Sequence, residues 1–245
     1  MLRSFLIFIV MFIFSHAHGQ SFKMTQQKAA RVKTAYSEKW QGLKADLKKD
    51  GISENYDMFL RVFKKEEVVE VWLQSKDAKE FKLFKTYSIC ASSGVLGPKR
   101  KQGDGQVPEG FYSIAVFNPY SSYHLSLGIS YPNASDKIIG KGNLGGDIMI
   151  HGNCVTIGCM PLTDNYIKEV YILAVEAKNN GQSTIPVHIF PAKLDDKGMD
   201  FLNTEDPKQL SFWINLKTGY DIFDKSKKLP KVTVDKTGKY LFSEK

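Results

Sequence analysis

The chain has 245 residues, of which 42% are apolar and 24% charged, and its formal net charge is +8. This balance excludes a wholly disordered chain, a collagen-like fibre and a polytopic membrane protein. The length allows one large domain or two small ones. Lys and Glu are interleaved along the sequence, so charge alone selects no partner.

The first twenty residues indicate export. Met1-Leu2-Arg3 gives a short positive start, and an unbroken run of ten apolar residues extends from Phe5 to Phe14. As a helix this run reaches about 15 Å, half of the roughly 30 Å that a bilayer core requires. Ala17-His18-Gly19 supplies small residues for a signal peptidase, with cleavage before Gln20. We therefore expect residues 1–19 to be the signal peptide of a periplasmic bacterial protein, with an uncleaved membrane anchor as the alternative.

Residues 20–54 are predicted to form a helical segment. Apolar side chains recur there at spacings of three and four residues, the period of an amphipathic helix, and Gly51 supplies a stop. The helix is expected over residues 25–49, with an apolar face made of Ala29, Val32, Tyr36, Trp40, Leu43 and Leu47.

From about residue 57 the apolar period becomes that of β-strands, and Gly and Pro residues separate the runs. A helix is predicted to begin at Thr163, whose hydroxyl can cap it, and to end at Asn180-Gly181. A further helix is predicted over residues 207–216, closed by Gly219. The predicted strands are residues 58–63, 68–73, 81–89, 111–117, 123–129, 147–151 and 185–190.

These elements predict a mainly-β (α+β) domain over residues 55–192 with flanking helices. Residues 193–245 are expected to form a helical appendage, and their last thirty positions carry many lysines. We expect this appendage to be peripheral.

The segment from Ile148 to Cys159 carries the strongest chemical signal. A short apolar strand ends at His151, and Cys159 follows eight residues later, directly behind Gly158. A nucleophilic thiol needs a base or a positive neighbour, and His151 is the candidate base. Gly158 allows a sharp backbone turn that presents the sulfur and leaves backbone N–H groups for an oxyanion. The pattern predicts acyl transfer through a thioester.

Three other interpretations of this segment stay open on spacing alone. His151 and Cys159 can be an ordinary strand-end histidine and a buried thiol. His151, Cys154 and Cys159 can also be zinc ligands, with His124 or Cys90 as the fourth. Finally, a Cys90–Cys154 disulfide fits the odd number of cysteines and leaves Cys159 as the free thiol.

The segment from His151-Gly152 through Thr156 to Gly158-Cys159 resembles the signature of the YkuD-type L,D-transpeptidases, which cross-link or edit bacterial peptidoglycan. The gap after the first His is shorter than usual, and Ile157 stands where the common signature has a second His. Both departures resemble the YafK-like branch of the family. Upstream segments are similar to that branch as well, namely residues 89–90, 93–94, 96–99, 103–104, 106–112, 118–119 and 123–127.

The resemblance covers residues 55–192 and implies a YkuD-like β-sandwich or barrel with flanking helices. It assigns Cys159 as nucleophile, His151 as base, and the amides of Gly158 and Cys159 as oxyanion donors. The group that orients His151 is not part of the motif. Asp147, four residues earlier, is one candidate, and a backbone carbonyl is the other.

Further residues are candidates for substrate binding. Lys99 and Arg100 lie in a Gly/Pro loop and are expected to bind stem-peptide carboxylates, unless this is simply a solvated basic loop. Tyr112, His124 and Thr156 are expected to line the cleft, with packing as the alternative role.

The resemblance thus implies a periplasmic cysteine L,D-transpeptidase that forms a Cys159 thioester with the L-centre of diaminopimelate in a tetrapeptide stem. Its expected partners are peptidoglycan stem peptides. For an amidase activity found in the YafK-like branch, a peptidoglycan-linked lipoprotein is a further expected partner. The alternatives are an L,D-carboxypeptidase, an amidase that releases that lipoprotein, and a silent cell-wall-binding module. No metal, cofactor or nucleic acid is expected.

Overall fold

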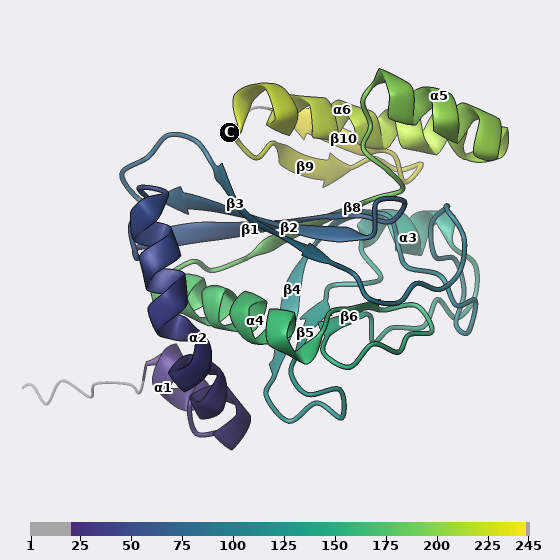
Figure 1. The fold of residues 1–245 in the computed structure, drawn as a ribbon. Coiled ribbons are helices and arrows are strands. Elements are labelled where there is room, and N and C mark those ends of the chain that lie inside the picture. The colour runs from purple at the N-terminus through teal and green to yellow at the C-terminus, as the bar shows by residue number, and fades with distance from the viewer. Residues whose placement is uncertain (1–20, 244–245) are drawn as a thin grey trace, which may run out of the picture.

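The computed structural model describes residues 21–243, so the predicted signal peptide over residues 1–19 lies outside the described residues. Within residues 21–243, no helix combines the length and apolar character that a membrane crossing requires. The described chain is built around a single curled sheet, with helices on both of its faces (Figure 1).

The N-terminal segment is two helices rather than the one predicted. α1 (Phe22–Gln26) is separated from α2 (Ala30–Lys49) because Ala29 adopts an extended backbone conformation. The predicted apolar face is confirmed in α2, where Val32, Leu43 and Leu47 are buried. This face packs against α4 (Asp164–Asn179), which the sequence predicted from its Thr163 cap.

The main sheet has eight strands in the order β3-β2-β1-β8-β4-β5-β6-β7. Two pairs, β1 with β8 and β6 with β7, are parallel, and the others are antiparallel. The predicted α+β class with flanking helices is confirmed. The strands are β1 (Tyr56–Phe63), β2 (Val68–Ser75), β3 (Lys82–Ser88), β4 (Gly110–Asn118), β5 (Ser126–Ile129), β6 (Met149–His151), β7 (Met160–Pro161) and β8 (Pro186–Phe190).

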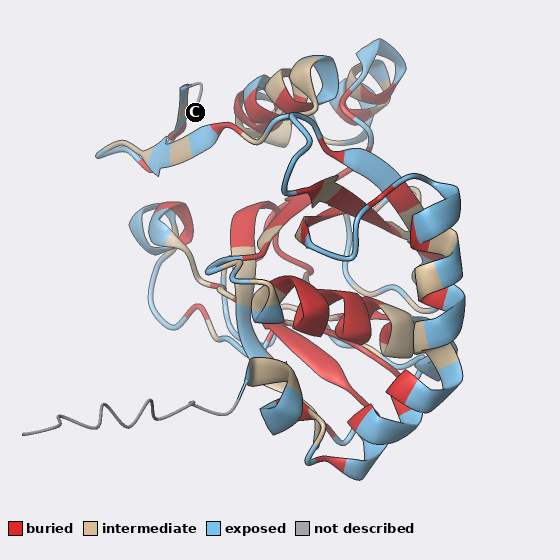
Figure 2. Cartoon of the chain, turned by 90° about the vertical axis from the view of Figure 1, so that its left-hand side faces the viewer, coloured by how far each residue is buried: buried red, intermediate tan, exposed pale blue. Residues whose placement is uncertain are grey.

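The inner face of the sheet is covered by α4, which is the most deeply buried helix of the fold (Figure 2). Its first turn is capped by Thr163, whose hydroxyl accepts from the N–H of Tyr166. The apolar side chains of Ile167, Val170, Leu173, Ala174 and Ala177 in this helix are all fully buried. A short helix that the sequence did not reveal, α3 (Ala134–Ile139), follows β5 and begins with a capping box between Asn133 and Asp136.

The outer face is covered by the C-terminal segment (Figure 1). Its elements are α5 (Asp196–Glu205), the 3₁₀ turn η1 (Pro207–Gln209), α6 (Leu210–Ser226) and the hairpin of β9 (Lys231–Val234) and β10 (Tyr240–Ser243). The predicted helix end at Gly219 is wrong, because α6 continues through it to Ser226. Gly219 instead permits close packing, since a Cβ there would lie 2.4 Å from the Phe242 ring.

This segment, expected to be peripheral, shares a core with the main sheet. Phe59 and Phe63 of β1 point to the outer face, where they contact Phe223 and Tyr220 of α6. Trp213 of the same helix is completely buried in this second core. Because β1 is buried on both of its faces, each face needs its own cover.

Replacing Trp213 with Ala should lower the free energy of unfolding by about 3–5 kcal/mol, the usual range for a large core side chain. The indole Nε1 also donates to the buried carboxylate of Glu109 at 2.8 Å, and that oxygen would lose its donor. Chemical denaturation measures the loss. The control is Ile214→Ala, one residue along and 53% exposed, which should change little. Equal effects in the two variants would contradict the assignment of Trp213 to a shared core.

Candidate active site

Pairing of two short strands brings the predicted catalytic residues together. β6 ends at His151, and β7 begins directly after Cys159. The two strands are parallel, with Ile150 opposite Met160. The intervening loop, residues 152–159, therefore leaves one strand and returns to the start of its neighbour. This topology places both side chains at one edge of the sheet.

His151 and Cys159 line the same cavity, which has a volume of about 330 Å³. Tyr123 forms another wall, with its ring centroid 4.8 Å from that of His151 and the two planes tilted by 33°. Ile157, at the position where the common signature has a second His, is 89% exposed and lines the cavity with an apolar side chain. The remaining lining residues are Asp147, Val155 and Thr156.

The two glycines of the motif are required by crowding. A Cβ on Gly152 would lie 2.6 Å from a carboxylate oxygen of Asp164 and 3.0 Å from the carbonyl of Tyr123. Gly158 has a φ of 129°, and a Cβ there would lie 3.1 Å from the carbonyl oxygen of Gln106. The sharp turn predicted at Gly158 is present.

Thr156 holds the turn that precedes Cys159. Its Oγ1 accepts from the N–H of Cys159 at 2.8 Å and of Gly158 at 3.2 Å, and it donates to the Cys159 carbonyl at 2.9 Å. The two amides expected to be free for an oxyanion are thus engaged in this arrangement. Thr156 lines the cavity, as expected, and its hydroxyl also organises the loop.

The imidazole of His151 is oriented by a backbone carbonyl. Its Nδ1 lies 2.5 Å from the carbonyl oxygen of Gly152, which can only accept, so Nδ1 carries the proton and Nε2 keeps its lone pair. Burial lowers the pKa of His151, and the Gly152 contact opposes this shift. Asp147, the other candidate, precedes β6 in a left-handed conformation with φ 56°, and its side chain makes no hydrogen bond to His151.

The thiol of Cys159 is free and half-buried. Its Sγ is 3.6 Å from the carbonyl oxygen of Asp147. Burial raises the pKa of Cys159, and the Asp147 carboxylate adds to this rise. A hydrogen bond from the Met149 backbone and the Lys99 ammonium oppose it only in part. A thiol with a raised pKa beside an imidazole with a lowered pKa is a neutral pair at pH 7. Such a pair reacts by general-base catalysis, in which the imidazole takes the proton as the sulfur attacks.

A disulfide joins Cys90 to Cys154. Cys154 belongs to the 152–159 loop, and the Cys90 amide also donates to the carbonyl of Pro161 on β7 at 3.0 Å. The segment after β3 is therefore attached to both ends of the catalytic loop. This pairing also takes Cys90 and Cys154 out of the ligand set on which the zinc interpretation depended.

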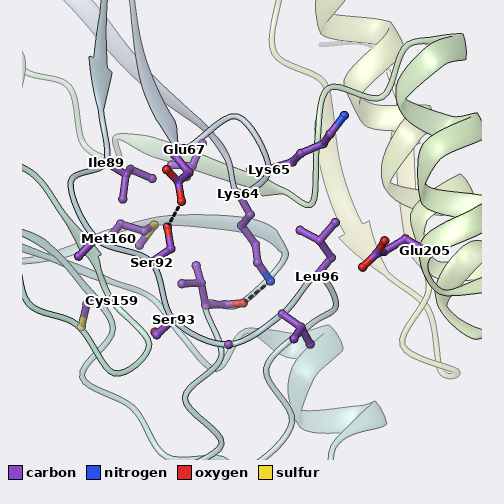
Figure 3. A pocket seen from close by; sticks show the side chains of 15 residues that line it. Lys64, Lys65, Glu67, Ile89, Ser92, Ser93, Leu96, Cys159, Met160 and Glu205 are labelled. Atoms are coloured by element: carbon purple, nitrogen blue, oxygen red, sulfur yellow. Dashed lines mark hydrogen bonds between the residues drawn. The ribbon is translucent and has the colours of Figure 1, made fainter.

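A second cavity, of about 310 Å³, lies on another side of Cys159 (Figure 3). Figure 3 places Cys159 at one end of this cavity and Glu205 of α5 at the other, with Leu96 beside Glu205. Lys64 extends between them and donates to the carbonyl of Val107 and to the buried Glu109 carboxylate. The lining of this second cavity also includes the charged residues Lys65 and Glu67 and the hydroxyls of Ser92 and Ser93.

Lys99 and Arg100 have partners inside the protein, which differs from the substrate-binding role we expected. Lys99 is buried and its Nζ lies 2.6 Å from Asp104, while Arg100 pairs with Asp136 at 3.1 Å. Burial raises the pKa of Asp104, but the Lys99 ammonium and three backbone N–H groups outweigh it and hold that pKa at about 2. The two basic residues therefore stabilise the loop over residues 97–106.

Tyr112 and His124 lie outside both cavities of Cys159. Tyr112 is buried, and its hydroxyl donates to Asp136 at 2.9 Å. The His124 ring faces Asp164, with Nδ1 3.9 Å from the carboxylate. Burial lowers the pKa of His124, and Asp164 opposes this shift. Neither residue reaches the Cys159 thiol, so Tyr112 and His124 do not line the cleft as expected.

Sequence reasoning missed the residues that shape the two cavities. Tyr123 was assigned only to a strand, whereas it precedes β5 and packs on the catalytic imidazole. Glu205 comes from α5, a helix that the apolar pattern did not reveal. Neither residue belongs to a local motif, so only the folded arrangement connects them with Cys159.

Comparison with known proteins finds related sequences over the same part of the chain. The family model of the YkuD L,D-transpeptidase catalytic domain matches residues 58–189. Over 192 residues, 76% of this chain and 74% of the relative, the sequence is 36% identical to the "Putative L,D-transpeptidase YafK" of Escherichia coli strain K12. The protein of that name from Escherichia coli O157:H7 matches equally.

Two solved structures are also similar. The helical cell shape determining protein Pgp2 of Campylobacter jejuni aligns with a TM-score of 0.45 and 19% identity, covering 74% of each chain. Bd1075 of Bdellovibrio bacteriovorus aligns with a TM-score of 0.39 and 19% identity, covering 69% of this chain and 62% of that one.

The neutral thiol–imidazole pair predicts how Cys159 responds to pH. Alkylation by iodoacetamide should be slower at pH 7 than for a free cysteine, because a raised thiol pKa leaves less thiolate. The rate should rise only as the pH exceeds the ordinary thiol range. Mass spectrometry of the alkylated protein follows the reaction, with Cys159→Ser as the blank. A rate constant that stays flat down to acidic pH would indicate a preformed thiolate–imidazolium pair and contradict this prediction.

The disulfide should contribute strongly to stability. It closes a loop with a sequence separation of 64, for which chain entropy gives about 4 kcal/mol. The double variant Cys90→Ser and Cys154→Ser should lose up to that amount in chemical denaturation. Cys159→Ser is the matched control, since it removes a thiol without opening a loop. A double variant as stable as this control would disprove the prediction.

Proposed function

Because the chain belongs to the YkuD family of L,D-transpeptidase catalytic domains, we propose that it remodels peptidoglycan as a cysteine acyltransferase. Cys159 is the nucleophile and His151 the general base. The proposal is carried by one observation, which is that a free thiol and a neutral imidazole from adjacent parallel strands line one cavity. A silent binding module has no use for this pairing.

The donor is a tetrapeptide stem, and the bond broken joins the L-centre of diaminopimelate to the terminal D-Ala. The Cys159 sulfur attacks the carbonyl carbon while His151 Nε2 takes the thiol proton. The tetrahedral intermediate then collapses, the C–N bond breaks, and the D-Ala nitrogen receives that proton from the imidazolium. A thioester between Cys159 and the stem remains.

Charge on the intermediate requires hydrogen-bond donors close to the sulfur. The amides of Gly158 and Cys159 lie there but donate to the Thr156 hydroxyl. We propose that the oxyanion replaces the Thr156 oxygen as their acceptor, since an anion is the stronger acceptor for an N–H group. Thr156 then keeps the turn in place until the intermediate forms.

The thioester is resolved by an amine acceptor, which gives transpeptidation, or by water, which gives hydrolysis. Cys159 lines two cavities of similar size, one with His151 and one that reaches Glu205. A two-substrate reaction needs space for a stem on each side of the thioester. This arrangement supports transpeptidation, with the L,D-carboxypeptidase and the amidase acting on a peptidoglycan-linked lipoprotein as the hydrolytic alternatives.

We also propose that the reaction takes place in the periplasm. The basic start, short apolar run and small residues of the first nineteen positions support export. The Cys90–Cys154 disulfide supports it independently, because such bonds persist in oxidising compartments.

The proposal predicts the products of purified muropeptides incubated with the protein. Mass spectrometry should show loss of D-Ala from tetrapeptide stems together with new cross-linked dimers. Cys159→Ala is the control and should give neither product, because no thioester can form.

Other outcomes assign other functions. Loss of D-Ala without dimers would identify a carboxypeptidase. Unchanged muropeptides, with release of protein from lipoprotein-linked sacculi, would identify the amidase. No Cys159-dependent change on either substrate would refute the enzymatic proposal.

A further inference from the structure

We propose that Arg31 of the N-terminal helix is a positioning residue for the catalytic base, because it fixes the loop over residues 119–125 that packs on His151. The inference rests on the proposed function in taking His151 as that base. Arg31 lies on α2, outside the residues 58–189 that the family model matches. The N-terminal helix α2 thereby helps to position His151.

The first link joins α2 to the loop. The Arg31 Nη1 donates to two carbonyl oxygens, that of Ser121 and that of His124, the latter at 2.8 Å. A charged donor shared by two carbonyls is stronger than a neutral hydrogen bond and draws both carbonyls toward one point. Arg31 therefore constrains the loop at two positions three residues apart.

The loop conformation depends on such a constraint. His124 adopts a left-handed conformation with φ 68°, which is uncommon for a residue with a side chain. Inside the loop, the Ser121 Oγ accepts from the N–H of Tyr123 at 3.0 Å. Arg31 binds the carbonyl of the left-handed residue itself and so helps to hold a backbone state that is unfavourable alone.

The second link joins the loop to the imidazole in two ways. The Tyr123 ring lies against the His151 ring, with centroids 4.8 Å apart. At the end of the loop, the Leu125 carbonyl accepts from the N–H of Gly152 at 3.2 Å. Gly152 is the residue whose carbonyl orients His151 Nδ1. The loop thus contacts one face of the ring and the N–H of the residue whose carbonyl fixes its tautomer.

The His151 side chain depends on these contacts because the only hydrogen bond of its imidazole within residues 21–243 is to Gly152. The ionisable groups that share its cavity are Cys159, Tyr123 and Asp147, and none of them hydrogen-bonds to the ring. The Gly152 carbonyl fixes the position of Nδ1, but the imidazole ring can still rotate about this hydrogen bond. Packing of Tyr123 against the ring prevents this rotation and keeps Nε2 directed into the cavity with the thiol.

The test compares Arg31→Ala and Arg31→Lys with Lys33→Ala. Lys33 is exposed on the same helix and its side chain makes no hydrogen bond within the described residues, so its loss removes the same charge without the loop contact. Arg31→Ala should lower kcat on muropeptides about tenfold or more with KM little changed, the result of a misplaced catalytic group. Arg31→Lys, which keeps a charged donor, should restore part of kcat, and Lys33→Ala should match the unchanged protein.

A second readout needs no substrate. The ¹⁵N spectrum of the imidazoles reports the tautomer and titration of His151, which His151→Ala assigns. The unchanged protein should show one tautomer, protonated at Nδ1, with a pKa below the ordinary histidine range. Arg31→Ala should show mixed tautomers and a pKa closer to that range, because the ring gains solvent. Tyr123→Ala should cause the same change from the other end of the contact.

The two readouts separate the possible failures. An unchanged imidazole spectrum in Arg31→Ala overturns the inference, whatever the kcat. The inference is also overturned if Arg31→Ala and Arg31→Lys lose kcat equally and this loss only follows a lower unfolding temperature. The role of Arg31 would then be structural alone. A changed spectrum in a protein that leaves muropeptides intact supports the positioning role and counts against the proposed function.

Discussion

The parallel pairing of β6 with β7 is the constraint on which the site depends. Two short strands joined by an eight-residue loop would be weak alone, and the surrounding structure holds them in place. The Cys90–Cys154 disulfide attaches the loop to the end of β3, and Thr156 fixes its final turn. Gly152 and Gly158 provide the space that this compact path requires. The separation of sulfur and imidazole is therefore determined by backbone geometry.

Two cores support the sheet, one on each of its faces. On the inner face, α4 and α2 bury the apolar side of β1. On the outer face, Trp213 and its neighbours cover the other side and supply a donor to the buried Glu109. That carboxylate also receives the Lys64 ammonium and the Gly97 amide, so the wall of the second cavity is connected to the C-terminal helices.

The sequence predicted the features that local patterns encode. The strands 58–63 and 68–73, the Thr163 cap and the His151–Cys159 pair follow from apolar periods and a compact motif. Side-chain partners across the fold left no such pattern. Asp136 lies far along the chain from Tyr112, so the structural role of Tyr112 was not foreseen. Asp104 is close to Lys99 in the sequence, but no local motif marks this pair. The role of Gly219 in close packing was not predicted either, because glycine in a sequence usually indicates a helix end.

Glu205 has an evolutionary consequence. It lies in α5, beyond the segment shared with the family model, and yet it forms the far end of a cavity that begins at Cys159. Substitutions or insertions in the C-terminal layer can therefore alter which molecules this cavity admits while the sulfur, the imidazole and their strands stay unchanged. Chains with the same catalytic motif can diverge in specificity through a region that motif comparisons do not cover.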